Sequence, residues 1–214
     1  MKLVVGDSNG FVGEELIRQA LICPAITSIV ALSRRETLGQ PSSTKLQRFI
    51  CDNFESYADS VKRELEDTDT STRALADLRH NQDRPLRFIY ISGHFAPHSP
   101  AEVPKQLPNN GLINYGLMRV REAESRVLAY AEHSKGSVRS CVAKPGHIEV
   151  PSWEKQMIPG LSIIDLREFA AALLDQVVNG FEKDTLLNGD MVQIGPRALG
   201  EEKSLNTILN LLIN

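Results

Sequence analysis

The sequence predicts a single α/β domain, spanning residues 1–214, in which helices flank a mainly parallel, doubly wound β-sheet. Short apolar runs alternate along the chain with longer amphipathic segments, which is the pattern of βα units. A turn containing three glycines, Gly6–Gly13, links the first apolar run directly to the first amphipathic segment. One domain is expected because the chain has an ordinary domain length and contains no repeat, low-complexity tract or linker.

The first third of the chain predicts three strands and two helices. Lys2–Val5 is the first strand, and the helix Gly10–Ile22 follows it with an apolar stripe at helical spacing. Ser28–Ser33 is apolar on both faces, which is typical of a strand buried in a parallel sheet. Arg48–Cys51 is expected as the third strand and Tyr57–Leu65 as a polar-faced helix.

The stretch between Phe54 and Pro85 departs from this pattern. Its longest apolar run is Ala74–Ala76, which is too short for a buried central strand. A doubly wound sheet places its fourth strand and another helix at this point in the chain. We therefore expect the usual fourth strand to be missing, or its place to be filled by irregular structure.

Regular periodicity returns after Pro85. The run Leu86–Ser92 is the clearest strand in the chain, and a loop with four prolines separates it from a long helix. Asp165, with Glu168 three residues later, is typical of a helix N-cap. The elements expected here are the strand Leu86–Ser92, the helix Leu112–His133, the strand Val138–Ala143, the helix Asp165–Asn179, the strand Met191–Ile194 and a closing helix from about Ser204.

The composition excludes several classes of protein. The net charge is −3 and the basic residues are dispersed, so no nucleic-acid partner is expected. No segment approaches the roughly 20 apolar residues that span a membrane, and the apolar N-terminal run is too short for a signal peptide. The three cysteines have neither metal-site spacing nor a disulfide pattern. We expect a reduced, soluble, cytoplasmic protein whose partner is a small-molecule substrate.

The glycine turn has the features of a dinucleotide site. Glycines let the backbone approach a pyrophosphate, and the following helix N-terminus offers free N–H groups and a positive dipole end. The strand before the turn and the helix after it strengthen this interpretation. The expected cofactor-binding residues here are Gly6, Gly10, Phe11, Val12 and Gly13.

This turn resembles the Gly-x-x-Gly-x-x-Gly turn of atypical and extended short-chain dehydrogenase/reductases, which are NAD(P)-binding proteins with a Rossmann fold. The whole chain outside residues 68–85 is similar to fungal members related to the Tat-interacting-protein-like oxidoreductases. The segments that carry this narrower likeness are Pro24–Arg35, Ala143–Gly146 and Ala171–Val178.

One position of the turn departs from the family pattern. With Gly10 and Gly13 aligned, the first glycine of the family falls on Asp7. A carboxylate repels a pyrophosphate, and its side chain intrudes where only backbone should approach. A structural alternative is that Asp7 caps the following helix. We interpret the cofactor site as degraded.

The adenosine half of the site is better preserved. The resemblance places Arg34 and Arg35 at the ribose, where paired arginines favour the 2′-phosphate of NADP, although they also suit a solvated loop. Asp52 follows the third strand, where relatives contact adenine, and it could equally cap a helix. The resemblance also adds Lys144 to the cofactor-binding residues.

The resemblance further implies a catalytic serine at a strand end and a Tyr-x-x-x-Lys motif on the next helix. Ser92 and Tyr115 match, while Arg119 stands at the lysine position. Arginine keeps the charge but not the shape, and proton relay through a titrating lysine is lost. Tyr115 could instead be a tyrosine that packs on the sheet.

Two histidines also follow predicted strands. His94 comes after Ser92, and His147 follows the next strand along the chain. Because ligands of open α/β sheets bind at the carboxyl ends of the strands, these residues and Asp7 are acid–base candidates. No metal site is expected, since Pro97 interrupts the helical spacing between His94 and His98.

Three functions are compatible with these residues. The favoured one is a redox-neutral acid–base enzyme without cofactor: an isomerase, cyclase or hydroalkoxylation enzyme acting on a small aromatic or polyketide-like secondary metabolite. The alternative is an NADPH-dependent reductase of a small carbonyl compound, and the third is a non-catalytic ligand-binding regulator. The first is preferred because the departures from the family converge on the cofactor site. The long helix could also pair with a second subunit in a homodimer.

Overall fold

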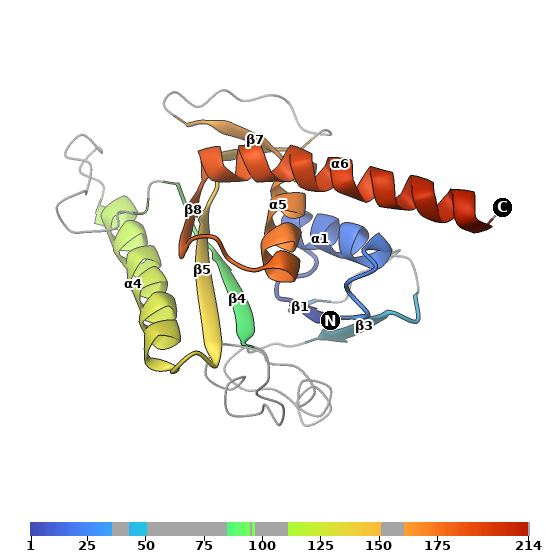
Figure 1. The fold of residues 1–214 in the computed structure, drawn as a ribbon. Coiled ribbons are helices and arrows are strands. Elements are labelled where there is room, and N and C mark those ends of the chain that lie inside the picture. Colours follow the sequence, from blue (N-terminus) through green and yellow to red (C-terminus); the bar gives the residue numbers. More distant parts are fainter. Residues whose placement is uncertain (36–42, 51–84, 95, 97–110, 151–160, 214) are drawn as a thin grey trace.

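The structure is a computed structural model that describes residues 1–35, 43–50, 85–94, 96, 111–150 and 161–213. Within helices, the side chains of residues 111–121 and 201–213 lie outside this description. Parallel sheets flanked by helices make up the described part, so the α/β class predicted from the sequence is confirmed (Figure 1).

The N-terminal part forms a parallel three-stranded sheet. Strands β1 (Lys2–Val5), β2 (Ser28–Ser33) and β3 (Leu46–Ile50) pair in the order β1-β2-β3. Helix α1 (Phe11–Ile22) connects β1 to β2, and Gly10 is its N-cap residue. The first two strands have the predicted bounds, while the third begins at Leu46, earlier than predicted, because its pairing with β2 starts there. Its predicted last residue, Cys51, lies outside the described residues.

A second parallel sheet follows in the chain. It contains β4 (Leu86–Ile91), β5 (Val138–Lys144) and β8 (Thr185–Leu187) in that order. A short parallel ribbon, β6 (His147–Glu149) with β7 (Ile163–Asp165), is a feature that the sequence did not predict. Among the described residues, no strand pairs with both β1 and β4. The predicted missing strand falls between positions 54 and 85, which lie outside the described residues.

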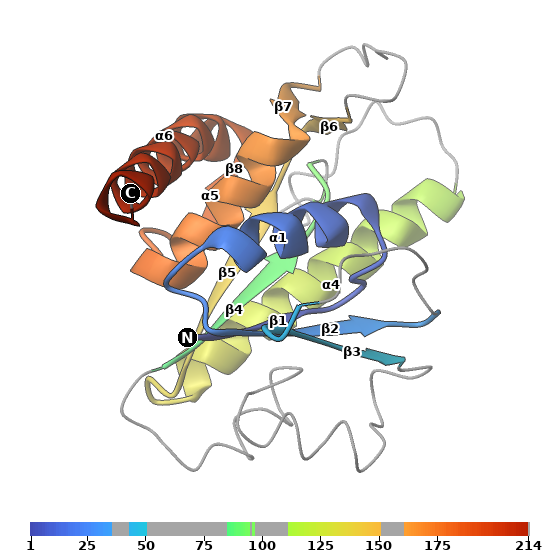
Figure 2. The same cartoon turned by 90° about the vertical axis from the view of Figure 1, so that its right-hand side faces the viewer.

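Helices cover both faces of the second sheet (Figures 1 and 2). Helix α4 (Gly111–His133) lies on one face, and α5 (Leu166–Asn179) lies on the other. Helix α1 packs against α5, and α6 (Asn188–Ile213) crosses α5 on its outer side. None of the helices that the structure describes has the length and apolar character needed to cross a membrane.

The alternation of side chains along β5 assigns them to these two faces. Lys144 contacts Glu124 of α4, so the even-numbered residues of β5 point toward α4. Cys141 and Ala143 point the other way and share a buried apolar cluster with Phe169 of α5. The α4 face of this sheet consequently carries the contact between Lys144 and Glu124, and the α5 face carries the apolar cluster.

The C-terminal prediction needs a correction. Met191–Ile194 was predicted as a strand and the closing helix from Ser204, but α6 begins at Asn188 and the strand is β8. Met191 and Ile194 are both buried in the cluster shared with α5, and their spacing of three fits one helix face. A run of four residues was too short to distinguish this helical period from a strand.

The N-cap predicted for α5 is confirmed. The Asp165 Oδ1 atom accepts hydrogen bonds from the backbone N–H groups of Arg167 at 2.8 Å and Glu168 at 3.2 Å. These bonds satisfy two of the donors that a helix start leaves free. They also fix the direction in which α5 leaves β7 and lies on the sheet.

Candidate functional site

The candidate site lies where parallel strands end. Asp7 follows β1, the arginines 34 and 35 follow β2, Ser92 and His94 follow β4, and His147 follows β5. The carboxyl ends of parallel strands meet at one edge of their sheet, where open α/β folds bind ligands. Two groups of contacts are described at these edges: a glycine turn beside β2 and a buried charged cluster between β4, α4 and β5.

The turn after β1 is held in a left-handed conformation by Asp7. Its φ angle is 53°, a value that Asp and Asn tolerate better than most residues. The Gly10 N–H donates to the Asp7 carbonyl oxygen at 3.0 Å, and the Ser8 N–H donates to the Leu32 carbonyl oxygen at 2.9 Å. Gly6 has no positive φ, so the unusual conformation lies at the aspartate and not at the preceding glycine.

Gly13 allows helix α1 to begin directly on this turn. A Cβ atom at position 13 would lie 2.6 Å from the Asp7 carbonyl oxygen and 2.8 Å from the Ser8 Cα atom. Both neighbours are backbone atoms that cannot move away, so the close approach requires glycine. Of the other two predicted turn residues, Phe11 is exposed and Val12 packs against the core shared with α5.

The Asp7 carboxylate lies near the start of α1, whose N-cap residue is Gly10. Gly10 makes no side-chain cap hydrogen bond, and the alternative that Asp7 caps this helix stays a prediction. The Oδ2 atom of Asp7 lies 3.1 Å from the position of a Cβ at Gly10, and the residue is exposed. A negative charge therefore lies close to the helix start, where a Rossmann fold would bind a diphosphate.

The end of β2 presents positive charge. Arg34 and Arg35 are both exposed, and the Arg35 carbonyl oxygen accepts a hydrogen bond from the Ser33 hydroxyl at 2.6 Å. Exposed guanidinium groups suit a phosphate ester such as the 2′-phosphate of NADP. Asp52, predicted for the same half of the site, lies outside the described residues.

A buried cluster joins β4, α4 and β5. The Ser92 hydroxyl donates to Glu124 Oε1, and the Lys144 ammonium lies 3.3 Å from Glu124 Oε2. The same ammonium donates to the carbonyl oxygen of Ala96. Ser92, Glu124 and Lys144 are 9%, 4% and 2% exposed, so this charged network is shielded from water. The Lys144 ammonium thus has its partners inside the protein, and its predicted contact with a cofactor stays a prediction.

Sequence reasoning did not identify Glu124. Position 124 falls in a stripe of small and apolar residues of the predicted helix, with Val120, Val127 and Ala131 at helical spacing. A carboxylate on an apolar stripe is a signal that could have been found, because buried acids are rare unless they are paired.

Tyr90 shares the α4 face of β4 with Ser92. Burial raises the pKa of the Tyr90 phenol, and the nearby negative charge of Glu124 raises it further. Both effects disfavour the phenolate, so Tyr90 stays a neutral hydroxyl group beside the cluster.

Tyr115 and Arg119 lie on α4, whose backbone is described here although these two side chains are not. Position 124 comes nine residues after position 115. At about 100° per residue, the two positions are half a turn apart in direction, so they lie on opposite sides of α4. Their predicted catalytic roles stay predictions.

The two histidines differ in their setting. His94 is half-buried in a turn after β4, and His147 opens β6 with its N–H donating to the Ser162 carbonyl oxygen at 2.7 Å. The preceding Gly146 donates its N–H to Asn188 Oδ1 at 2.7 Å, which fixes the approach to His147. Within the described ranges, no group of three or more His, Cys, Asp or Glu residues could hold a metal ion.

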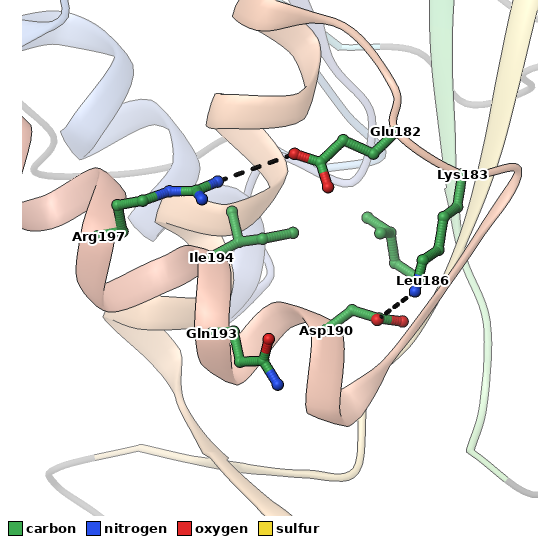
Figure 3. A pocket seen from close by; sticks show the side chains of 7 residues that line it. All are labelled: Glu182, Lys183, Leu186, Asp190, Gln193, Ile194 and Arg197. Atoms are coloured by element: carbon green, nitrogen blue, oxygen red, sulfur yellow. Dashed lines mark hydrogen bonds and ion pairs between the residues drawn. The ribbon is translucent and has the colours of Figure 1, made fainter.

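A separate hollow of about 160 Å³ lies between the loop before β8 and the first turns of α6 (Figure 3). Its charged groups already pair with one another: Lys183 lies 2.6 Å from Asp190, and Arg197 lies 3.9 Å from Glu182.

No protein-family model matches the chain, and no curated protein matches it. Solved structures do match it over most of its length. A short-chain dehydrogenase from Streptomyces avermitilis has a TM-score of 0.57 at 15% identity, over 99% of this chain and 96% of that one. A dTDP-glucose 4,6-dehydratase from Bacillus anthracis, solved with NAD, has a TM-score of 0.57 at 12% identity, covering 87% and 74%. A UDP-glucose 4-epimerase from Thermus thermophilus, also solved with NAD, has a TM-score of 0.56 at 10% identity, covering 92% and 83%.

These similarities establish the fold of the chain. It is a Rossmann-like α/β fold, which the chain shares with these solved structures. Identities of 10–15% do not carry an activity from those proteins to this chain. The narrower resemblance to fungal Tat-interacting-protein-like oxidoreductases stays a prediction.

Proposed function

We propose that this protein is a redox-neutral acid–base enzyme that acts on a small aromatic or polyketide-like metabolite without a nicotinamide nucleotide. The observation that carries the proposal is the exposed Asp7 carboxylate, held at a φ of 53° beside the start of α1. A diphosphate placed on this turn would meet a fixed negative charge where the Rossmann site normally offers only N–H groups. The fold is kept, and the part that changes is the one that holds the cofactor.

The strand-end residues suit proton transfer. In a cyclisation or hydroalkoxylation, a base removes a proton from a substrate hydroxyl, the oxygen adds to an electron-poor carbon, and an acid returns a proton to the neighbouring carbon. His94 and His147 are candidates for the acid and the base, because an imidazole ring can both accept and donate a proton. Asp7 and Tyr115 are further candidates for these two roles. No hydride is transferred, so binding and orientation of the substrate complete the chemistry.

An NADPH-dependent reductase is the second candidate function. Arg34 and Arg35 favour it, since both are exposed at the end of β2 where NADP carries its 2′-phosphate. The dehydratase and epimerase of similar fold, both solved with NAD, also support a nicotinamide nucleotide. In that case Ser92 would orient a carbonyl and Tyr115 would protonate it.

Two measurements on the purified chain separate these functions. Calorimetric titration with NADPH and NADH should show no binding, and ortho-hydroxychalcone, whose phenol can add to its own enone, should lose its absorbance without added nucleotide. The chalcone is chosen because ring closure moves one proton and changes no oxidation state. Micromolar binding of NADPH would overturn the redox-neutral proposal and favour the reductase.

A further inference from the structure

The Glu124–Lys144 pair is a buried ion pair between α4 and β5. The two side chains are 6% and 2% exposed, and their charged atoms are 3.3 Å apart. Removing two charges from water is costly, and well-packed apolar side chains often replace such a pair without loss of stability. The pair is therefore better explained by the other groups that Glu124 and Lys144 bind than by the electrostatic attraction between the two.

Both members hold the segment that follows β4. Glu124 accepts the Ser92 hydroxyl hydrogen bond at the start of this segment, and Lys144 donates to the Ala96 carbonyl oxygen at its end. Backbone bonds support the same residues: the Ser92 N–H donates to Ala143 at 2.8 Å, and the Ala96 N–H donates to the Gly93 carbonyl oxygen at 3.0 Å. His94 lies between these two fixed points, in neither a strand nor a helix.

We propose that Glu124 and Lys144 are positioning residues, and that their buried pair is a clamp that sets the place of the His94 imidazole at the carboxyl edge of β4. This inference rests on the proposed function insofar as His94 is one of its acid–base groups. A proton-transfer group must come within about 2.6–3.2 Å of the atom it serves, and misplacement by about 1 Å can reduce turnover about 100-fold. A turn residue gains such accuracy only from supporting contacts, and here they come from α4 and β5.

The clamp also explains the direction of the Ser92 hydroxyl. Its proton is donated inward to an acceptor-only carboxylate, so toward a ligand this oxygen can only accept a hydrogen bond. A ligand that reaches Ser92 must then bring a hydrogen-bond donor such as a phenol or alcohol. A carbonyl oxygen receives no hydrogen bond from a Ser92 hydroxyl in this orientation. This agrees with a hydroxyl-bearing substrate for the redox-neutral reaction.

The clamp can be tested without knowing the substrate. The chain has five histidines, and the imidazole cross-peaks of a ¹⁵N,¹³C-histidine-labelled protein can be assigned to His94 with a His94→Gln variant. The double variant Glu124→Leu with Lys144→Met removes both charges together, so neither is left buried alone. We expect the His94 cross-peak to move beyond its linewidth and to broaden, while the His133 and His147 cross-peaks stay in place.

A matched control is the surface pair of Lys183 and Asp190, which lie 2.6 Å apart at the hollow between the loop before β8 and α6 (Figure 3). The double variant Lys183→Met with Asp190→Asn also removes one positive and one negative charge from the protein, and it should leave the His94 cross-peak unchanged. If the clamp variant fails to fold, Ser92→Ala removes only the first bond and should move the His94 cross-peak by a smaller amount.

An unmoved His94 cross-peak in a folded clamp variant, or in Ser92→Ala when only that variant folds, would overturn the clamp. This result is independent of the nucleotide titration. Micromolar NADPH binding together with a displaced His94 would refute the redox-neutral function and retain the clamp. Absence of NADPH binding together with an unmoved His94 cross-peak would retain the redox-neutral function and refute the clamp.

Discussion

The charge of Asp7 can be tested by a single isosteric substitution, Asp7→Asn. Asparagine keeps the shape of the side chain and tolerates the left-handed φ of 53° that position 7 adopts. It removes only the negative charge. If that charge is what excludes a diphosphate, the variant should bind NADPH more tightly than the natural chain does.

The size of the effect follows from the geometry of the turn. The Asp7 Oδ2 atom lies 3.1 Å from the place that a Cβ at Gly10 would take, so we expect a phosphate bound to the helix start to come within roughly 4 Å of it. Two unit charges at this distance interact by about 1 kcal/mol in water and about 4 kcal/mol at an effective dielectric constant of about 20. Because Asp7 is exposed, the lower half of this range, about 1–2.5 kcal/mol, applies, and we expect affinity to rise about 5- to 70-fold.

The assay is calorimetric titration of NADPH at low and at moderate salt. Salt screens exposed charges, so the difference between the natural chain and Asp7→Asn should shrink as the ionic strength rises. Glu14→Gln is the matched control, since it removes one exposed negative charge from the first turn of α1 and leaves the glycine turn intact. We expect this control to change the affinity far less.

Asp7→Ala separates charge from conformation. Alanine removes the same charge but is disfavoured at positive φ by about 1–2 kcal/mol, so the melting temperature should fall by roughly 2–8 °C, whereas Asp7→Asn should leave it nearly unchanged. Equal NADPH affinity of the natural chain and Asp7→Asn would refute the electrostatic explanation, as would micromolar binding by the natural chain.

Three further predictions concern the stability and reactivity of the fold. Gly195→Ala places a Cβ against the backbone of α5 and should destabilise the protein by about 1–3 kcal/mol. A Cβ at Gly200 meets nothing within 4 Å, so Gly200→Ala should stabilise α6 by up to about 1 kcal/mol. Thermal unfolding of the two variants measures both effects. The hydrogen bond from Lys183 holds the pKa of Asp190 below its usual 3.8, so this stabilisation is present above that pH and is lost as the pH falls through the lowered pKa. The melting temperature of Lys183→Met should therefore fall less steeply with acid than that of the natural chain, and parallel curves would contradict this. Burial raises the pKa of the Cys141 thiol to about 12, so iodoacetamide should alkylate it only after unfolding, and peptide mass spectrometry of the native protein at pH 8 would reveal any earlier labelling.

Much of the described fold could be predicted from local sequence patterns. The strands Lys2–Val5 and Ser28–Ser33 have the predicted bounds, and α4 and α5 begin within one residue of prediction. Apolar periodicity and cap residues act over a few neighbours, so the sequence expresses them directly. The strand predicted at Met191–Ile194 is wrong because burial of one helix face against α5 outweighs the β-propensity of a short apolar run.

The candidate site also has a part that the sequence predicted and a part that only the structure shows. The glycine turn and the departure at Asp7 could be read from the sequence, because spacing alone places them between a strand and a helix. The sequence left the conformation of Asp7 open between a helix cap and an intruding charge. Only the structure shows that this residue takes the positive φ while Gly10 is the N-cap residue of the helix.

By itself the sequence determined most of the longer strands and helices of the described part, the position of the turn and the charge placed in it. The tertiary structure decided which polar groups meet: Ser92 and Glu124 are 32 residues apart in the chain, and Glu124 and Lys144 are 20 apart. Periodicity describes each element separately, whereas a buried ion pair exists only when a helix packs across two strands. Its members can be charged because packing brings them together away from water, and no pattern within a single element contains that information.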